Sequence, residues 1–130
     1  MKKLIVFVLA LLCVIGLVGC SNNSISGIDK ATKIEVVQYD KSNGTETGTI
    51  PLTEETSIKH IVDNLRSLKL KKMKNNDPTV LEYKLTFYNS NGEMIETISI
   101  PPNDWIDFNG YFHSIVSGEL DRDYLAGLFE

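Results

Sequence analysis

Catalytic signatures are missing from this 130-residue sequence. It contains no Gly-x-Ser-x-Gly elbow, no His-Glu-x-x-His and no Walker loop. Its two histidines, His60 and His113, lie 53 positions apart and lack the spacing of metal ligands. No serine is paired by the sequence with an oriented base, which a serine nucleophile requires. These absences argue against nucleophilic and metal-dependent catalysis, and we expect neither a cofactor nor a metal site.

Positive charge is also in short supply. Thirteen lysines and arginines stand against seventeen aspartates and glutamates, which gives a formal charge of −4. If Lys2 and Lys3 are removed with the apolar N-terminal segment, eleven cations remain and the charge becomes −6. Nucleic-acid binding needs clustered cations that displace counterions from phosphates. We therefore exclude nucleic acid as a working partner.

Long apolar runs are limited to one, Leu4–Val18, which has fifteen residues and follows Lys2 and Lys3. A helix needs about 20 residues to cross the hydrocarbon core of a bilayer. The run is short for a permanent span, but its length and the preceding positive charge are typical of a signal peptide. We expect residues 1–19 to be this signal peptide.

Cysteine occurs twice, as Cys13 inside the apolar run and as Cys20 directly after it. The tetrapeptide Leu17–Cys20, "LVGC", resembles the lipobox of bacterial lipoproteins. The resemblance implies that a diacylglyceryl group is added to the Cys20 sulfur and that the bond after Gly19 is cut. It places the protein on the extracytoplasmic face of the cell membrane, where its membrane contact is the lipid on Cys20. Two other interpretations remain: Cys20 is an ordinary thiol behind an ordinary signal peptide, or residues 4–19 stay as a short uncleaved anchor.

The mature chain would keep a single sulfur, so no disulfide framework can form. Its first residues, "SNNSISGIDK", are rich in Ser, Asn and Gly and offer little apolar surface. We expect residues 20–31 to be a flexible tether behind the acylated cysteine. The remaining residues, 32–130, have the length of one domain.

Three Asn-Gly pairs divide this domain and predict three hairpins, because Asn-Gly favours the type I′ turn. The expected cross-strand pairs are Val37 with Ile50 in the first hairpin, Tyr83 with Ile100 and Leu85 with Ile98 in the second, and Phe108 with Tyr111 and Ile106 with His113 in the third. Between the first two hairpins, apolar residues at helical spacing predict a helix capped by Thr53 that buries Ile58, Ile61, Val62, Leu65 and Leu68. A short C-terminal helix follows Asp121 or Asp123.

The predicted fold is therefore α+β. It consists of an antiparallel sheet of about six strands, one long helix packed on a face and a short C-terminal helix. The segments "LTFYNSNGEMIETISI", "DWIDFNGYFHSI" and "LDRDYLAGLF" resemble the C-terminal half of small, largely uncharacterised lipoprotein domains of Gram-positive bacteria. This resemblance rests on turns and apolar residues, which indicate a fold and not an activity.

One polar cluster, "NDWIDFNG", places Asp104 and Asp107 around Trp105. Two carboxylates beside an aromatic ring suit acid and base catalysis on a glycan, and oxygen ligands suit calcium. The spacing does not match the EF-hand loop. The structural alternative is that the aspartates flank a turn while Trp105 packs at the end of the sheet. As a binding surface, this loop is the first candidate.

A basic run supplies the second candidate surface, with lysines at Lys69, Lys71, Lys72 and Lys74. If the run ends the predicted helix, these cations complement the helix dipole. The alternative is that they contact anionic lipid headgroups or wall polymers.

From the sequence we predict a non-enzymatic interaction or sensing module that binds a protein, peptide or cell-wall component. The alternative prediction is a small hydrolase or glycan-acting protein that uses Asp104 and Asp107.

Overall fold

The computed structural model describes Ile25 and residues 27–74 and 80–130. The expected signal peptide and Cys20 lie outside these described residues.

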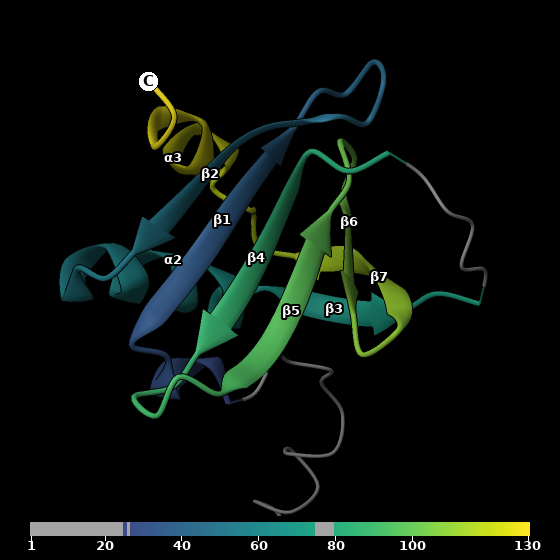
Figure 1. Cartoon of the computed structure of the whole chain (residues 1–130). Coiled ribbons are helices and arrows are strands. Elements are labelled where there is room, and N and C mark those ends of the chain that lie inside the picture. The colour runs from purple at the N-terminus through teal and green to yellow at the C-terminus, as the bar shows by residue number, and fades with distance from the viewer. Residues whose placement is uncertain (1–24, 26, 75–79) are drawn as a thin grey trace, which may run out of the picture.

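The described chain has the α+β architecture that the sequence predicts, built on one antiparallel sheet in the order β2-β1-β4-β5-β6-β7-β3. Its strands are β1 (Lys33–Tyr39), β2 (Glu46–Leu52), β3 (Lys69–Lys72), β4 (Tyr83–Tyr88), β5 (Met94–Ile100), β6 (Trp105–Phe108) and β7 (Tyr111–Ser117). A 3-10 turn, η1 (Ile28–Lys30), comes before β1, and the helices are α2 (Glu55–Ser67) and α3 (Arg122–Gly127). Figure 1 shows β3 and β7 crossing behind β5, so the sheet curls around one inner face.

The inner face of this curled sheet carries the core. Side chains alternate across a strand, and Tyr83, Leu85 and Phe87 of β4 all point inward and are buried, as predicted. Helix α2 covers the face with the apolar residues that its spacing predicts: Ile58, Ile61, Val62 and Leu65. Full burial of such a side chain contributes about 1.5–3 kcal/mol, so this contact dominates the packing of the helix.

The third hairpin has the predicted register, and the second has it from Tyr83 to Phe87, beyond which an irregularity between Phe87 and Tyr88 shifts the pairing by one residue. Tyr83 lies opposite Ile100 and Leu85 opposite Ile98. In the third hairpin the expected pairs also form, Phe108 with Tyr111 and Ile106 with His113. Its turn has positive φ at Asn109 (55°) and Gly110 (78°), as a type I′ turn requires.

The first hairpin differs from the prediction by one residue, because Val36 and not Val37 lies opposite Ile50. The connection is longer than two residues: the Asp40 amide donates to the Thr45 carbonyl at 2.8 Å. The Asp40 carboxylate accepts hydrogen bonds from the Ser42 amide at 2.8 Å and from its hydroxyl, and these bonds stabilise the wider loop. They also lower the pKa of Asp40 below its ordinary value.

The sheet has seven strands among the described residues, where about six were expected. The additional strand is β3, which contains most of the basic run. Helix α2 ends at Ser67, and the amide of Leu68 closes it with a hydrogen bond to the Leu65 carbonyl. The prediction that these lysines end a helix is therefore wrong. Lysine has little intrinsic preference for strands, so the extended conformation of β3 results from its pairing with β7.

The predicted tether is too long, since its second half belongs to the folded domain. Ile25 is 2 % exposed and Ile28 is fully buried, and both join the hydrophobic core. Gly27, between them, adopts a φ of 84°, a left-handed conformation that glycine accommodates without a steric cost.

The helix ends agree with the prediction at one helix and differ at the other. The Asp121 side chain caps α3 by accepting a hydrogen bond from the Tyr124 amide at 3.2 Å. The residue before α2 is Glu54 and not Thr53, and no side chain caps that end. Within the described part of the chain, no helix combines the length and the apolar character needed to cross a membrane.

Candidate functional site

A polar cleft lies between the C-terminal half of α2, the strands β6 and β7, and the segment that leads into α3. Its volume is about 820 Å³. It is lined by Asn64, Asp104, Ile115, Gly118, Glu119, Leu120, Asp121, Arg122 and Asp123, and we call it the α3 cleft. Four of these residues carry carboxylates and one carries a guanidinium group, so the lining is predominantly anionic.

Asn64 connects one wall of the α3 cleft to the other. Its amide nitrogen donates to the Glu119 carbonyl at 2.8 Å, and its side-chain oxygen accepts from the Asp121 amide at 2.9 Å. The nitrogen and the oxygen of this side-chain amide therefore both bind the segment before α3 and hold it against α2.

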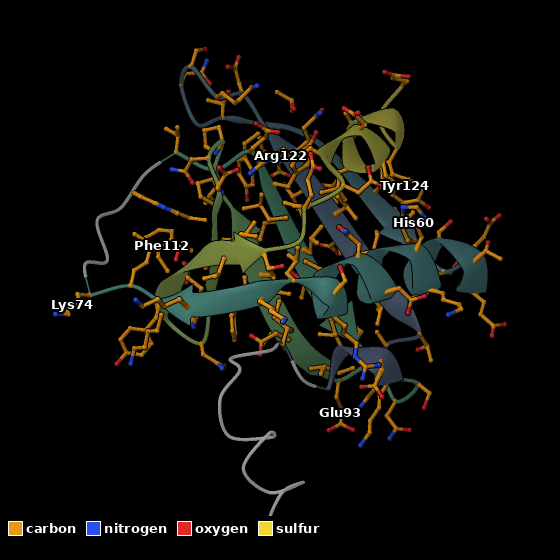
Figure 2. All side chains as sticks on the ribbon, turned by 180° about the vertical axis from the view of Figure 1, so that it is seen from behind. His60, Lys74, Glu93, Phe112, Arg122 and Tyr124 are labelled. Carbon is orange, nitrogen blue, oxygen red and sulfur yellow. The ribbon has the colours of Figure 1, made fainter. Side chains whose placement is uncertain are left out.

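His60 and Asp121 form a second link between α2 and α3. The His60 Nε2 atom lies 2.9 Å from Asp121 Oδ2, and the imidazole stacks on the Tyr124 ring with 3.8 Å between centroids. Figure 2 shows His60 and Tyr124 side by side where the two helices meet. The hydrogen bond from His60, followed by the one from the Tyr124 amide, lowers the pKa of Asp121.

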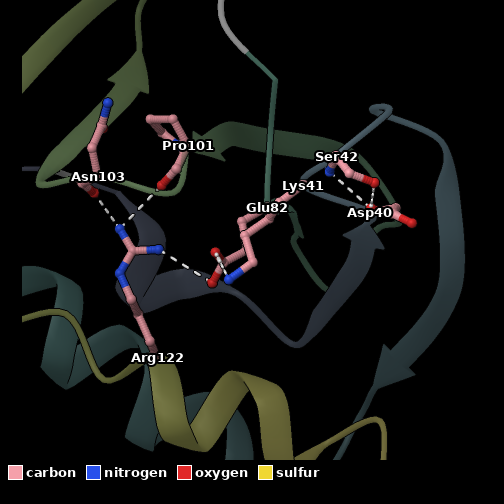
Figure 3. Close-up of polar contacts among 7 residues, drawn as sticks. All are labelled: Asp40, Lys41, Ser42, Glu82, Pro101, Asn103 and Arg122. Atoms are coloured by element: carbon pink, nitrogen blue, oxygen red, sulfur yellow. Dashed lines mark hydrogen bonds and ion pairs between the residues drawn. The ribbon is translucent and has the colours of Figure 1, made fainter.

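Arg122 ties the start of α3 to the sheet. Its Nη2 atom donates to the carbonyls of Pro101, at 3.0 Å, and Asn103. Its Nη1 atom lies 3.4 Å from Glu82 Oε1, and Glu82 also pairs with Lys41 at 3.4 Å (Figure 3). The Glu82 side chain is only 13 % exposed, so its charge needs these two cations.

The two aspartates of the candidate loop are not brought together by the structure. Asp104 lines the α3 cleft, and its carbonyl accepts a hydrogen bond from the Ile115 amide at 3.0 Å. Asp107 is in β6, between the buried Ile106 and Phe108, and therefore points to the opposite, outer face. Among the described residues that line the cleft, Asp104 is present and Asp107 is not.

Trp105 lies on the outer face with Asp107, in a strand and not in the loop expected from the sequence. Its ring is tilted against that of Phe112, with 6.0 Å between centroids. Phe112 itself is 7 % exposed. This packing agrees with the structural alternative, in which Trp105 stabilises the end of the sheet.

The four lysines of the basic run remain together, on β3 and just beyond it. Lys69, Lys71, Lys72 and Lys74 are exposed, whereas Leu70 between them is 6 % exposed and enters the core. The Lys72 Nζ atom lies 3.5 Å from the centroid of the Tyr111 ring. No ion pair among the described residues includes any of these lysines.

His113 is part of the core structure. It is 5 % exposed and stacks on Phe108 with 4.0 Å between ring centroids, while Nδ1 lies 2.9 Å from the Tyr111 carbonyl oxygen. Burial lowers its pKa, so the ring favours its neutral form.

The sequence interpretation missed Asn64, Asp121 and Arg122 as residues of the cleft. Their partners in other segments lie between 19 and 61 positions away in the chain, and no local sequence pattern predicts such contacts. A scan of the described residues finds no group of three or more His, Cys, Asp or Glu side chains arranged to hold a metal ion. Comparisons with protein-family models, curated proteins and solved structures found no significant match to this chain.

Proposed function

We propose that this protein is a non-enzymatic binding module held on the extracytoplasmic face of the cell membrane by a lipid on Cys20. The observation that carries the proposal is the short distance in sequence between "LVGC" and the core. Ile25 is 2 % exposed and lies five positions after Cys20. Five residues span at most about 18 Å, so a lipid on Cys20 keeps the folded domain next to the bilayer.

We favour binding over catalysis because the polar side chains of the cleft hold segments of the domain together. In the α3 cleft, the side chains of Asn64 and Arg122 are hydrogen-bonded to the backbone of other segments, and that of Asp121 is bonded to His60 and to the Tyr124 amide. A hydrolase that used Asp104 and Asp107 needs both carboxylates at one bond, but Asp104 lines the α3 cleft and Asp107 points to the outer face of the sheet. The lysines of β3 are exposed together, and no ion pair of the described residues includes them.

The test compares two cysteine substitutions in cells supplied with radiolabelled palmitate. The unmodified chain and a Cys13→Ser variant should both incorporate label and sediment with membranes, because Cys13 lies inside the expected signal peptide. A Cys20→Ser variant should lose the label and the cleavage after Gly19, which intact mass detects. Equal labelling of the Cys20→Ser variant, or an unmodified thiol on Cys20, overturns the proposal.

A further inference from the structure

Among the residues that the structure describes, the sheet has two edge strands, β2 and β3, and β3 is hydrogen-bonded to β7 on one side only. The Met73 amide donates to the Phe112 carbonyl at 2.8 Å, which shows that this amide points toward β7. Backbone groups alternate in direction along a strand, so the amide of Lys72 points away from β7, toward the open edge. The edge therefore offers backbone donors and acceptors in the geometry that a further strand requires.

Cations occupy both faces of this edge. Lys71 lies opposite Ser114 and Lys72 opposite His113, and consecutive residues of a strand point to opposite faces. Lys72 rests on the Tyr111 ring, which is 45 % exposed and orients the ammonium group on its face. Leu70 holds the strand to the core, so the lysines extend from a fixed base.

We propose that β3 is a docking edge for an extended acidic segment of a partner protein, which adds to the sheet as an eighth strand. This inference rests on the proposed function as a binding module and names its partner class. An added strand brings alternate side chains to both faces, so its carboxylates meet lysines on either side of β3. A flat bilayer reaches the cations of one face at a time. A second copy of β3 is repelled, since both edges carry the same charge.

The experiment uses the full chain in neutral detergent and a ten-residue peptide of alternating glutamate and threonine as the probe. Peptide binding is followed by fluorescence anisotropy, and amide exchange is followed residue by residue. Strand addition should protect the Lys72 amide and leave the exchange of the Lys71 amide, which faces β7, unchanged. The same peptide with alternate backbone amides N-methylated should not bind, because it keeps the charges but cannot pair as a strand.

Variants of the edge test the contribution of charge. Lys71→Glu with Lys72→Glu should raise the peptide Kd by about ten-fold or more, because each change replaces an attractive cross-strand pair with a repulsive one. Lys71→Arg with Lys72→Arg should keep the binding. Lys59→Glu, a matched change at an exposed lysine of α2, should also leave the Kd unchanged.

Three outcomes overturn the inference. The first is that the peptide does not bind, and the second is that the N-methylated peptide binds equally well. The third is that the protein binds phosphatidylglycerol vesicles, that the peptide does not compete with this binding, and that the peptide does not protect the Lys72 amide. The last result assigns the lysines to the lipid surface. None of these outcomes depends on acylation of Cys20, so a failed palmitate labelling and a failed peptide experiment are distinguishable.

Discussion

The two edges of the sheet are closed against unwanted pairing in different ways. On β2, Pro51 provides no amide hydrogen for a further strand. On β3, exposed lysines act against unwanted pairing, because they repel any cationic strand. A missing amide hydrogen weakens pairing with every partner, whereas charge still admits a partner of opposite sign. The difference teaches that β2 is a closed edge and β3 a selective one.

The largest effect is expected from Leu70, which fastens β3 to the core. Leu70→Ala should reduce the free energy of unfolding by about 2–5 kcal/mol, because it removes a buried side chain and leaves a cavity. The matched change on the other edge, Ile50→Ala, should cost less, since Ile50 is only half-buried. Urea unfolding of both variants measures the difference, and equal losses contradict the view that β3 depends on this one anchor.

A smaller loss is expected when α3 is released from the sheet. Arg122→Ala removes the hydrogen bonds to the Pro101 and Asn103 carbonyls and one of the two cations beside Glu82. We expect a loss of about 1–3 kcal/mol and faster amide exchange in β2, which the residues after α3 cover.

Arg66→Ala, at an exposed arginine of α2, is the control for Arg122→Ala and should change stability by less than about 0.5 kcal/mol. If β2 exchanges at the same rate in Arg122→Ala as in the unmodified chain, α3 does not help to protect that strand.

Removal of charge from the selective edge should produce self-association. Lys71→Thr with Lys72→Thr leaves the strand geometry intact and removes the repulsion between two copies of β3. Analytical ultracentrifugation should then detect concentration-dependent dimers. Pro51→Thr on β2 should have little effect alone, because it restores a single backbone donor and removes no charge. Monomers at all concentrations in the lysine variant contradict the role of charge.

The smallest effect concerns pH. The hydrogen bond from His60 lowers the pKa of Asp121 below its ordinary value of 3.8, so the folded state binds that proton less well than the unfolded state. The stabilisation is complete above pH 3.8 and disappears as the pH falls through the lower pKa of the folded state. Because the pair is exposed, we expect less than about 1 kcal/mol. The difference in urea midpoint between the unmodified chain and His60→Ala should therefore shrink between pH 6 and pH 2.5, and a constant difference contradicts this assignment.

Local patterns predicted much of the fold. Alternation in β4 and helical spacing in α2 identified the core faces, because a half-buried strand or helix must repeat its apolar residues with its own period. The Asn109-Gly110 turn set the register of the third hairpin for a similar reason, since few residue pairs accept positive φ twice. The first hairpin was predicted one residue out of register, because its loop is longer than two residues and the register shifts between Gln38 and Tyr39.

The candidate site was much less predictable. The sequence placed Asp104 and Asp107 in one cluster, but strand β6 directs Asp107 to the outer face while Asp104 lines the α3 cleft. It also grouped the four lysines correctly but assigned them to a helix end. Their position on an edge strand depends on pairing with β7, more than forty positions later in the chain.

By itself, the sequence determined the α+β class and the core faces, because both depend on the pattern of neighbouring residues. Only the tertiary structure decided that Ile25 and Ile28 belong to the core, that Arg122 and Asn64 fasten α3, and that the lysines form a sheet edge. These features depend on contacts between segments far apart in the chain. Such contacts form only when burial of the whole core offsets the entropy of bringing the segments together.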